Sequence, residues 1–173
     1  KLPFGFNFNI FLAVIICGGA GMLIPEALGL GTQTLRSIMS TGYEIQFLAL
    51  LFAAKIFLTA TCIGFGLFGG VFSPALLVGA TSGAIVGKFV SLVFQVNNAG
   101  HAIMLAMPIC GMAAVASAVI GAPIAGVVII LELTMSYEFA LGAMISVVVA
   151  LIVSDALFGH SFFDRQLLDR GID

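Results

Sequence analysis

Charged side chains are scarce in this sequence. Only 8% of the 173 residues are Asp, Glu, Lys or Arg, whereas about 25% is usual in soluble domains. So few charges cannot cover a globule of this size in water, which excludes an ordinary soluble enzyme and an intrinsically disordered chain. The six Lys and Arg residues also form no basic face that would hold nucleic acid.

Tryptophan is absent, and cysteine and histidine are rare. Cys17, Cys62 and Cys110 stand far apart in apolar stretches, so we expect small core residues and neither a disulfide framework nor a metal site. His101 and His160 are expected in loops at helix ends, without a second metal ligand at suitable spacing. We also find no Ser-His-Asp or paired-carboxylate pattern, so we expect no enzyme, no metal and no cofactor.

Apolar residues dominate what remains. They make up 61% of the chain, the mean hydropathy is +1.24, and 21 glycines suit closely packed membrane helices. A membrane span needs about 20 apolar residues. We expect full spans at about 8–24, 45–63, 72–94 and 139–157. Two further helices, at about 102–118 and 122–134, are each short for a span. Short helices are expected at about 32–39, with Thr32 as the N-cap, and in the tail.

Glycine and proline breaks separate these segments inside apolar surroundings. Non-helical backbone survives at membrane depth only where protein or a water-filled cavity receives its polar groups. Broken helices that meet in the bilayer commonly form ion and substrate sites. The sequence therefore predicts an all-α, multi-pass integral membrane protein with broken, tilted helices.

The most informative break is GGVFSP at residues 69–74. Pro74 suits the first turn of a helix, where its missing N–H costs nothing. The amides before it lack intrahelical acceptors and lie at the positive end of the helix dipole. Such a helix start can bind an anion without a full positive charge, although a simple turn before a helix is the alternative. The candidate anion site comprises Gly70, Val71, Phe72 and Ser73.

The segment GGVFSPALLVGA resembles the G-x-F-x-P signature of the CLC chloride channel and transporter family, through Gly70, Phe72 and Pro74. In that family the motif opens a helix that faces the chloride pathway. Three further stretches match in order. They are FAAK at 52–55 followed by Thr59, GAP at 121–123 followed by ILELT at 130–134, and SFFD at 161–164.

The resemblance implies that residues 1–173 form the C-terminal half of an inverted-repeat membrane domain. Neither G-S-G-I-P nor G-x-E-G-P, the first-half motifs of the family, occurs in the sequence. We therefore expect a fragment that works with a missing N-terminal half, without a second domain. The family also implies a homodimer through the helices at 122–134 and 139–157, set in membrane lipid.

One position departs from the family pattern. A family tyrosine at the start of the last helix donates a hydrogen bond to the central anion, and Phe163 matches it here, with Phe162 as the one-residue alternative. Phenylalanine has no hydroxyl. The resemblance thus implies a weaker central site, or one formed by ring edge and backbone, and uncertain chloride–proton coupling. A plain core aromatic at Phe163 is the other interpretation.

Ionisable residues inside apolar segments are functional candidates. Lys55 lies in the middle of a span and could raise the local potential for anions, or it could snorkel or pair with a carboxylate or carbonyl. Glu132 could relay protons or be structural. Asp155 could lie on the pathway or at a helix end.

The prediction is transport of chloride or a similar small anion, as a voltage-gated-type channel or a chloride/proton antiporter. A different inverted-repeat transporter for an organic anion and a non-transporting assembly subunit remain alternatives. Arg165 and Arg170 follow the last span, which favours a cytoplasmic C-terminus. We expect a location in the cell (inner) membrane.

Overall fold

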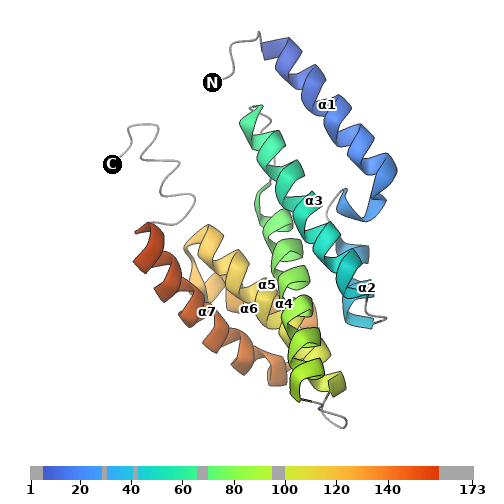
Figure 1. The fold of residues 1–173 in the computed structure, drawn as a ribbon. Coiled ribbons are helices and arrows are strands. Elements are labelled where there is room, and N and C mark those ends of the chain that lie inside the picture. The colour runs from blue at the N-terminus through green and yellow to red at the C-terminus, as the bar shows by residue number, and fades with distance from the viewer. Residues whose placement is uncertain (1–5, 29–30, 41–42, 66–69, 95–99, 160–173) are drawn as a thin grey trace.

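The computed structural model describes residues 6–28, 31–40, 43–65, 70–94 and 100–159. These residues form helices and no strand, as Figure 1 shows, so the predicted all-α class is confirmed. The helices are α1 (Phe6–Leu23), the 3-10 turn η1 (Pro25–Ala27), α2 (Thr32–Ser40), α3 (Ile45–Gly64), α4 (Phe72–Phe94), α5 (Gly100–Ile120), α6 (Pro123–Thr134) and α7 (Tyr137–Phe158).

The boundaries predicted for helices within the described residues agree with these bounds to within two residues. The short helix predicted in the tail lies outside the described residues. Within the described ranges, four helices are long and apolar enough to cross a membrane, namely Ile45–Gly64, Phe72–Phe94, Ala102–Ile120 and Tyr137–Leu157. The apolar stretches Ile10–Leu23 and Pro123–Thr134 are shorter. The combination of full-length and short apolar helices fits the predicted broken-helix membrane fold.

Three local predictions were wrong. The helix predicted at 102–118 is short for a span, but α5 runs to Ile120 with Pro108 inside it and is long enough to span. His101 lies in the first turn of α5 and not in a loop. Thr32 is the first helical residue of α2, and the carbonyl of Gly31 accepts the first bond from the amide of Leu35 at 2.8 Å. Gly31 takes the cap position because its φ of +69° suits glycine.

Glycines bring α4 and α5 into direct backbone contact. A Cβ added at Gly79 would lie 2.3 Å from the carbonyl oxygen of Gly111, and one added at Gly83 would lie 2.2 Å from that of Met107. A side chain does not fit in either place. Small residues allow such close approach between membrane helices, where van der Waals packing drives association.

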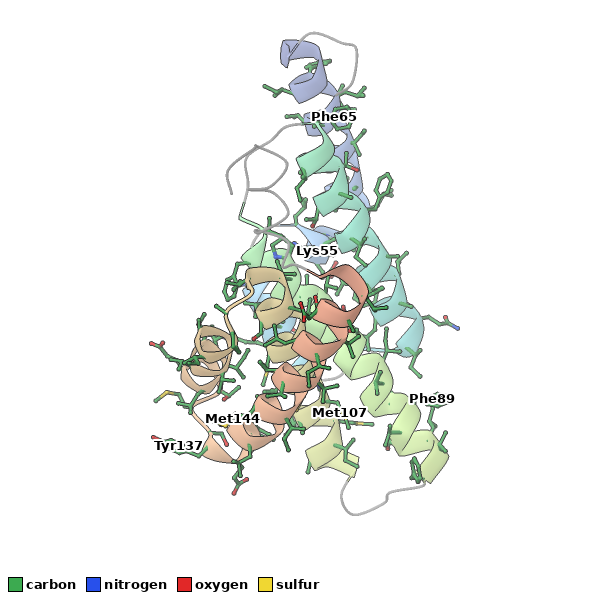
Figure 2. All side chains as sticks on the ribbon, turned by 90° about the vertical axis from the view of Figure 1, so that its left-hand side faces the viewer. Lys55, Phe65, Phe89, Met107, Tyr137 and Met144 are labelled. Atoms are coloured by element: carbon green, nitrogen blue, oxygen red, sulfur yellow. The ribbon has the colours of Figure 1, made fainter. Side chains whose placement is uncertain are left out.

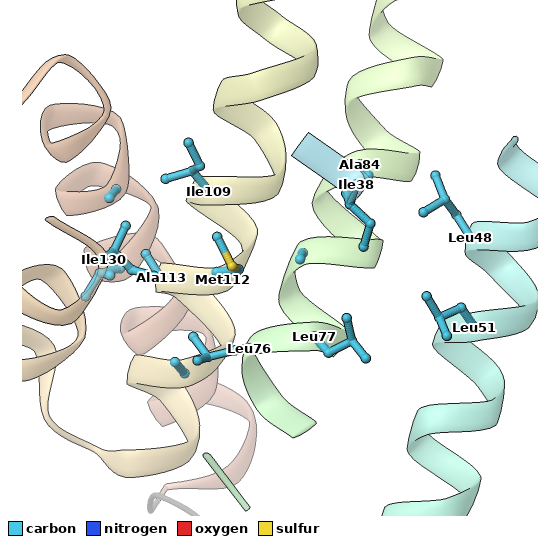
Figure 3. Close-up of a cluster of buried hydrophobic side chains, with 14 of the residues drawn as sticks. Ile38, Leu48, Leu51, Leu76, Leu77, Ala84, Ile109, Met112, Ala113 and Ile130 are labelled. Atoms are coloured by element: carbon cyan, nitrogen blue, oxygen red, sulfur yellow. The ribbon is translucent and has the colours of Figure 1, made fainter. Parts of the chain in front are cut away.

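The buried core runs across this pair of helices. Figure 3 shows Leu48 and Leu51 of α3 on one side, Leu77 of α4 in the middle, and Ile109 of α5 with Ile130 of α6 on the other side. Outside the core, many large apolar side chains are exposed. Phe89 and Tyr137 lie at the periphery in Figure 2, as expected for helices that face lipid or further protein.

Lys88 fixes the far end of α4. Its Nζ donates a hydrogen bond to the carbonyl oxygen of Tyr43, which lies just before α3. The other end of α4 begins at Phe72, next to α3 and η1, and it carries the GVFSP motif. The packing therefore holds α4 firmly along its length and presents its N-terminus beside α3.

Candidate functional site

The start of α4 has the geometry that the motif predicts. The helix begins at Phe72, and the amide of Ala75 donates to the carbonyl of Val71 at 3.0 Å. Pro74 therefore sits in the first turn, where no intrahelical bond is lost. The amides of this first turn have no intrahelical acceptor and point along the positive end of the helix dipole.

Gly70 precedes this helix start and is exposed. A Cβ added there would meet nothing within 4 Å among the described residues. No described residue fills the space beside Gly70, in contrast to the close backbone contact further along the same helix.

A cavity of about 250 Å³ lies against the start of α4. We call it the α3–α4 cavity. Its walls come from α1, η1, α3 and the α4 motif, so four separate segments converge on it. The lining residues are Cys17, Ala27, Leu28, Lys55, Leu58, Thr59, Cys62, Ile63, Gly70, Val71 and Pro74.

Lys55 is the charged residue in this wall. It is 5% exposed and belongs to the inward stripe of α3 together with Leu48, Leu51 and Leu58. Its Nζ donates a hydrogen bond of 2.9 Å to the carbonyl oxygen of Ala27 in η1. Figure 2 shows Lys55 in the interior of the molecule.

The environment of Lys55 tests two of the alternatives that the sequence left open. Snorkelling is wrong, because the side chain is buried and points toward η1. Pairing with a backbone carbonyl is present. That hydrogen bond does not by itself remove the charge, and the electrostatic role of Lys55 toward anions stays a prediction.

From the sequence we expected the helix start to form an anion site without a full positive charge, and Lys55 was a separate electrostatic candidate. The structure places Lys55 on the same cavity as Gly70 and Val71. The role of both in anion binding stays a prediction. The arrangement combines a helix N-terminus with one buried cation.

The other candidates lie elsewhere. Phe72 packs against the hydrophobic core, and Ser73 follows it in the first turn of α4. Glu132 of α6 is exposed. Asp155 is exposed near the end of α7, and its carbonyl accepts the amide of Gly159 at 2.9 Å, so it is a helix-end residue. The candidates Phe162, Phe163 and His160 lie outside the described residues.

Several residues of the cavity were not among the candidates predicted from the sequence. Three of them are Cys17, Ala27 and Cys62. A signal existed for one of them. Cys62 continues the stripe of Leu51, Lys55 and Leu58 by one further turn, whereas nothing in the sequence places α1 or η1 against that stripe.

Cys17, Cys62 and Cys110 are free thiols in this structure. Two of them, however, meet in space: the sulfurs of Cys17 and Cys62 are 3.4 Å apart. Among the residues that the structure describes, no three His, Cys, Asp or Glu side chains cluster closely enough to hold a metal ion.

Sequence comparison gives a consistent family match. The family described as "Voltage gated chloride channel" matches residues 6–155. The H(+)/Cl(-) exchange transporter ClcA of Vibrio cholerae serotype O1 is 34% identical over 155 residues, which cover 89% of this chain and 32% of the relative. The voltage-gated ClC-type chloride channel ClcB of Escherichia coli is 30% identical and covers 91% of this chain and 37% of the relative.

A solved structure has a similar fold. It is the crystal structure of a slow cyanobacterial Cl-/H+ antiporter, which is 26% identical to this chain with a TM-score of 0.70. The similarity covers 79% of this chain and 31% of the antiporter chain. The chain thus spans about a third of the length of the relatives that it matches.

Proposed function

The chain belongs to the voltage-gated chloride channel family, and on that premise we propose that it helps to move chloride or a similar small anion across a membrane. The observation that carries the proposal is the α3–α4 cavity. One cavity collects the start of α4, through Gly70 and Val71, and the buried cation of Lys55. No covalent bond is broken in this function.

The helix start supplies anion ligands of moderate strength. The amides of Gly70, Val71, Phe72 and Ser73 are the candidate donors, aligned with the positive end of the α4 dipole. In a low-dielectric setting such partial charges attract an anion strongly enough to remove water. Because these charges are only partial, the anion can also leave the site, which conduction requires.

Lys55 is proposed to act through its field. Its tether to Ala27 holds the ammonium in the wall, so that it raises the potential without capping the anion. Two unit charges about 4 Å apart attract by about 4 kcal/mol at an effective dielectric constant of 20. A larger separation between Lys55 and the anion, and the hydrogen bond to the carbonyl of Ala27, reduce this attraction. The anion therefore stays mobile.

The remaining parts of the proposal concern the larger assembly. We propose that residues 1–173 act with an N-terminal half of the same domain, in membrane lipid of the cell (inner) membrane and with a cytoplasmic C-terminus. A homodimer would form through α6 and α7, whose exposed faces carry Ile124, Val128, Leu141 and Ile145. Phe163 is proposed to face the central part of the path.

Chloride flux from liposomes tests the function directly. The full-length protein is reconstituted with chloride inside and without any organic anion. We expect chloride efflux, whereas a transporter for organic anions would give none until its substrate is added. An assembly subunit would give none under either condition.

The same liposomes distinguish the two mechanisms in the family. An exchanger moves protons in the direction opposite to chloride. A pH-sensitive dye inside the vesicles reports the resulting change in pH. Because Phe163 lacks the family hydroxyl, we propose weak coupling, with fewer protons moved per chloride than in an exchanger that has the tyrosine. Tight coupling would contradict this part of the proposal.

A further inference from the structure

The wall of the α3–α4 cavity contains a pair of thiols. Cys17 of α1 and Cys62 of α3 are 45 positions apart in the chain, yet their sulfurs are 3.4 Å apart. Both residues are partly buried, and both belong to the lining of the cavity. Cys110, the third cysteine, lies on α5, and its carbonyl accepts a hydrogen bond from Ser146.

We infer that Cys17 and Cys62 form an oxidisable dithiol, whose disulfide links α1 to α3 at the wall of the cavity. A disulfide requires sulfurs about 2.05 Å apart, so the sulfurs must approach by little more than an ångström. Neither helix contributes a second thiol to this wall, and the pairing is therefore unambiguous.

The oxidant is a peroxide, which accepts two electrons. The thiolate of one cysteine attacks an oxygen of hydrogen peroxide, giving a sulfenic acid and hydroxide, which takes up the released proton to become water. The second thiolate attacks the sulfenic sulfur and expels the hydroxyl, which leaves as water after taking the remaining proton. In sum, two thiols and one peroxide give one disulfide and two waters.

The link restrains a loosely held part of the molecule. α1 has large exposed apolar side chains on its outer face, including Phe11, Val14 and Ile15, and it meets the rest of the chain at α3 and η1. The disulfide fixes that meeting point beside Lys55 and the start of α4. The effect on flux rests on the proposed function, while the formation of the disulfide does not.

Counting thiols tests the inference. The purified full-length protein is treated with hydrogen peroxide at mildly alkaline pH, and the free thiols are then alkylated and mapped by mass spectrometry without reduction. Within residues 1–173 we expect the alkylated thiols to fall from three to one (3 − 2 = 1), with Cys17 and Cys62 in one linked peptide. Dithiothreitol should restore all three.

Two variants serve as controls. Cys110→Ser should leave the linked peptide unchanged. Cys62→Ser should abolish it and leave Cys17 as a sulfenic acid, without a Cys17–Cys110 link. Separate alkylation of Cys17 and Cys62 after peroxide, or a link found only between two copies of the chain, would overturn the inference.

Chloride flux provides the second readout. We expect a loss of flux after peroxide that dithiothreitol reverses in the wild type and that Cys62→Ser does not show. Unchanged flux in protein whose thiols are fully linked would overturn the connection to the cavity. If the protein moves no chloride at all, the proposed function fails, and the thiol count still decides on the dithiol.

Discussion

The start and the middle of α4 use glycine in opposite ways. At Gly70, before the first turn, an added Cβ would meet nothing within 4 Å among the described residues, and Gly70 lines the α3–α4 cavity. At Gly79 and Gly83, in the middle of the helix, an added Cβ would strike the backbone of α5. On the proposed function the first glycine leaves room for an anion, whereas the other two leave room for a helix.

This difference separates function from stability along one helix. The closed contact of α4 with α5 fixes the direction in which the first turn points. The open end can then offer its amides without a side chain in the way. Substitutions before the first turn should therefore lower transport, whereas substitutions in the contact with α5 should lower stability.

The largest effect is expected in the closed contact. Gly83→Ala places a Cβ 2.2 Å from the carbonyl oxygen of Met107, so the two helices must move apart. Overpacking of this kind costs about 1–3 kcal/mol or more. We expect a lower midpoint of thermal unfolding for the full-length protein in detergent.

Gly19→Ala is the matched control for that substitution. Gly19 lies in α1, and its added Cβ meets nothing within 4 Å. Replacing an exposed helical glycine by alanine stabilises by about 0.5–1 kcal/mol. Equal unfolding midpoints for the two variants would show that α4 and α5 are not in backbone contact.

At the open end, Gly70→Leu should affect transport and not folding. The Cβ of the leucine would meet nothing within 4 Å among the described residues, and the rest of the side chain is expected to fill space in front of the α4 amides. We expect chloride flux to fall about tenfold or more, which corresponds to about 1.4 kcal/mol. Yield and dimer content should stay near the wild-type values, and Gly19→Leu should keep its flux. A Gly70→Leu variant with normal flux would refute the assignment.

Lys55→Met should weaken chloride binding by a smaller factor. The change removes the buried charge and the donor to Ala27. We expect the dissociation constant to rise about threefold to tenfold, or about 0.7–1.4 kcal/mol, as measured by calorimetric titration. The unpaired carbonyl of Ala27 adds a stability cost of about 1–3 kcal/mol. Lys55→Arg keeps the charge and should restore binding; unaltered binding in Lys55→Met would make Lys55 a packing residue.

The smallest effect concerns α5 and α6. A Cβ at Gly126 would lie 1.8 Å from Oγ of Ser117, a buried hydroxyl without a hydrogen-bond partner among the described residues. Gly126→Ala should cost about 1 kcal/mol, because the hydroxyl can rotate away, and Ser117→Ala alone should cost close to nothing. In the double variant the two should couple by about 0.5 kcal/mol. Strict additivity in thermal unfolding would contradict this contact.

Much of the fold could be predicted from the sequence because its signals are local. Long apolar runs predicted the helices, and Gly121 with Pro123 indicated the start of α6. The failures were also local. The helix at 102–118 was expected to be short for a span, but α5 is longer, and its Pro108 packs against Gly83 in a contact that the sequence does not reveal.

The candidate site could be predicted only in its two separate parts. The motif at Gly70 and the buried charge of Lys55 are visible in the sequence, but their meeting on one cavity depends on how α3 packs against α4. The partner of Lys55 is a backbone carbonyl, which no residue type signals. The contact of Cys17 with Cys62 depends in the same way on the packing of α1.

The central claim is that an anion binds in the α3–α4 cavity. Bromide tests it most directly, since bromide can replace chloride and its anomalous scattering locates it in crystals of the full-length protein. The account predicts a bromide peak between the ammonium of Lys55 and the amides of Gly70 and Val71, and loss of that peak in Gly70→Leu. Bromide bound elsewhere in the protein, with this cavity empty, would contradict it.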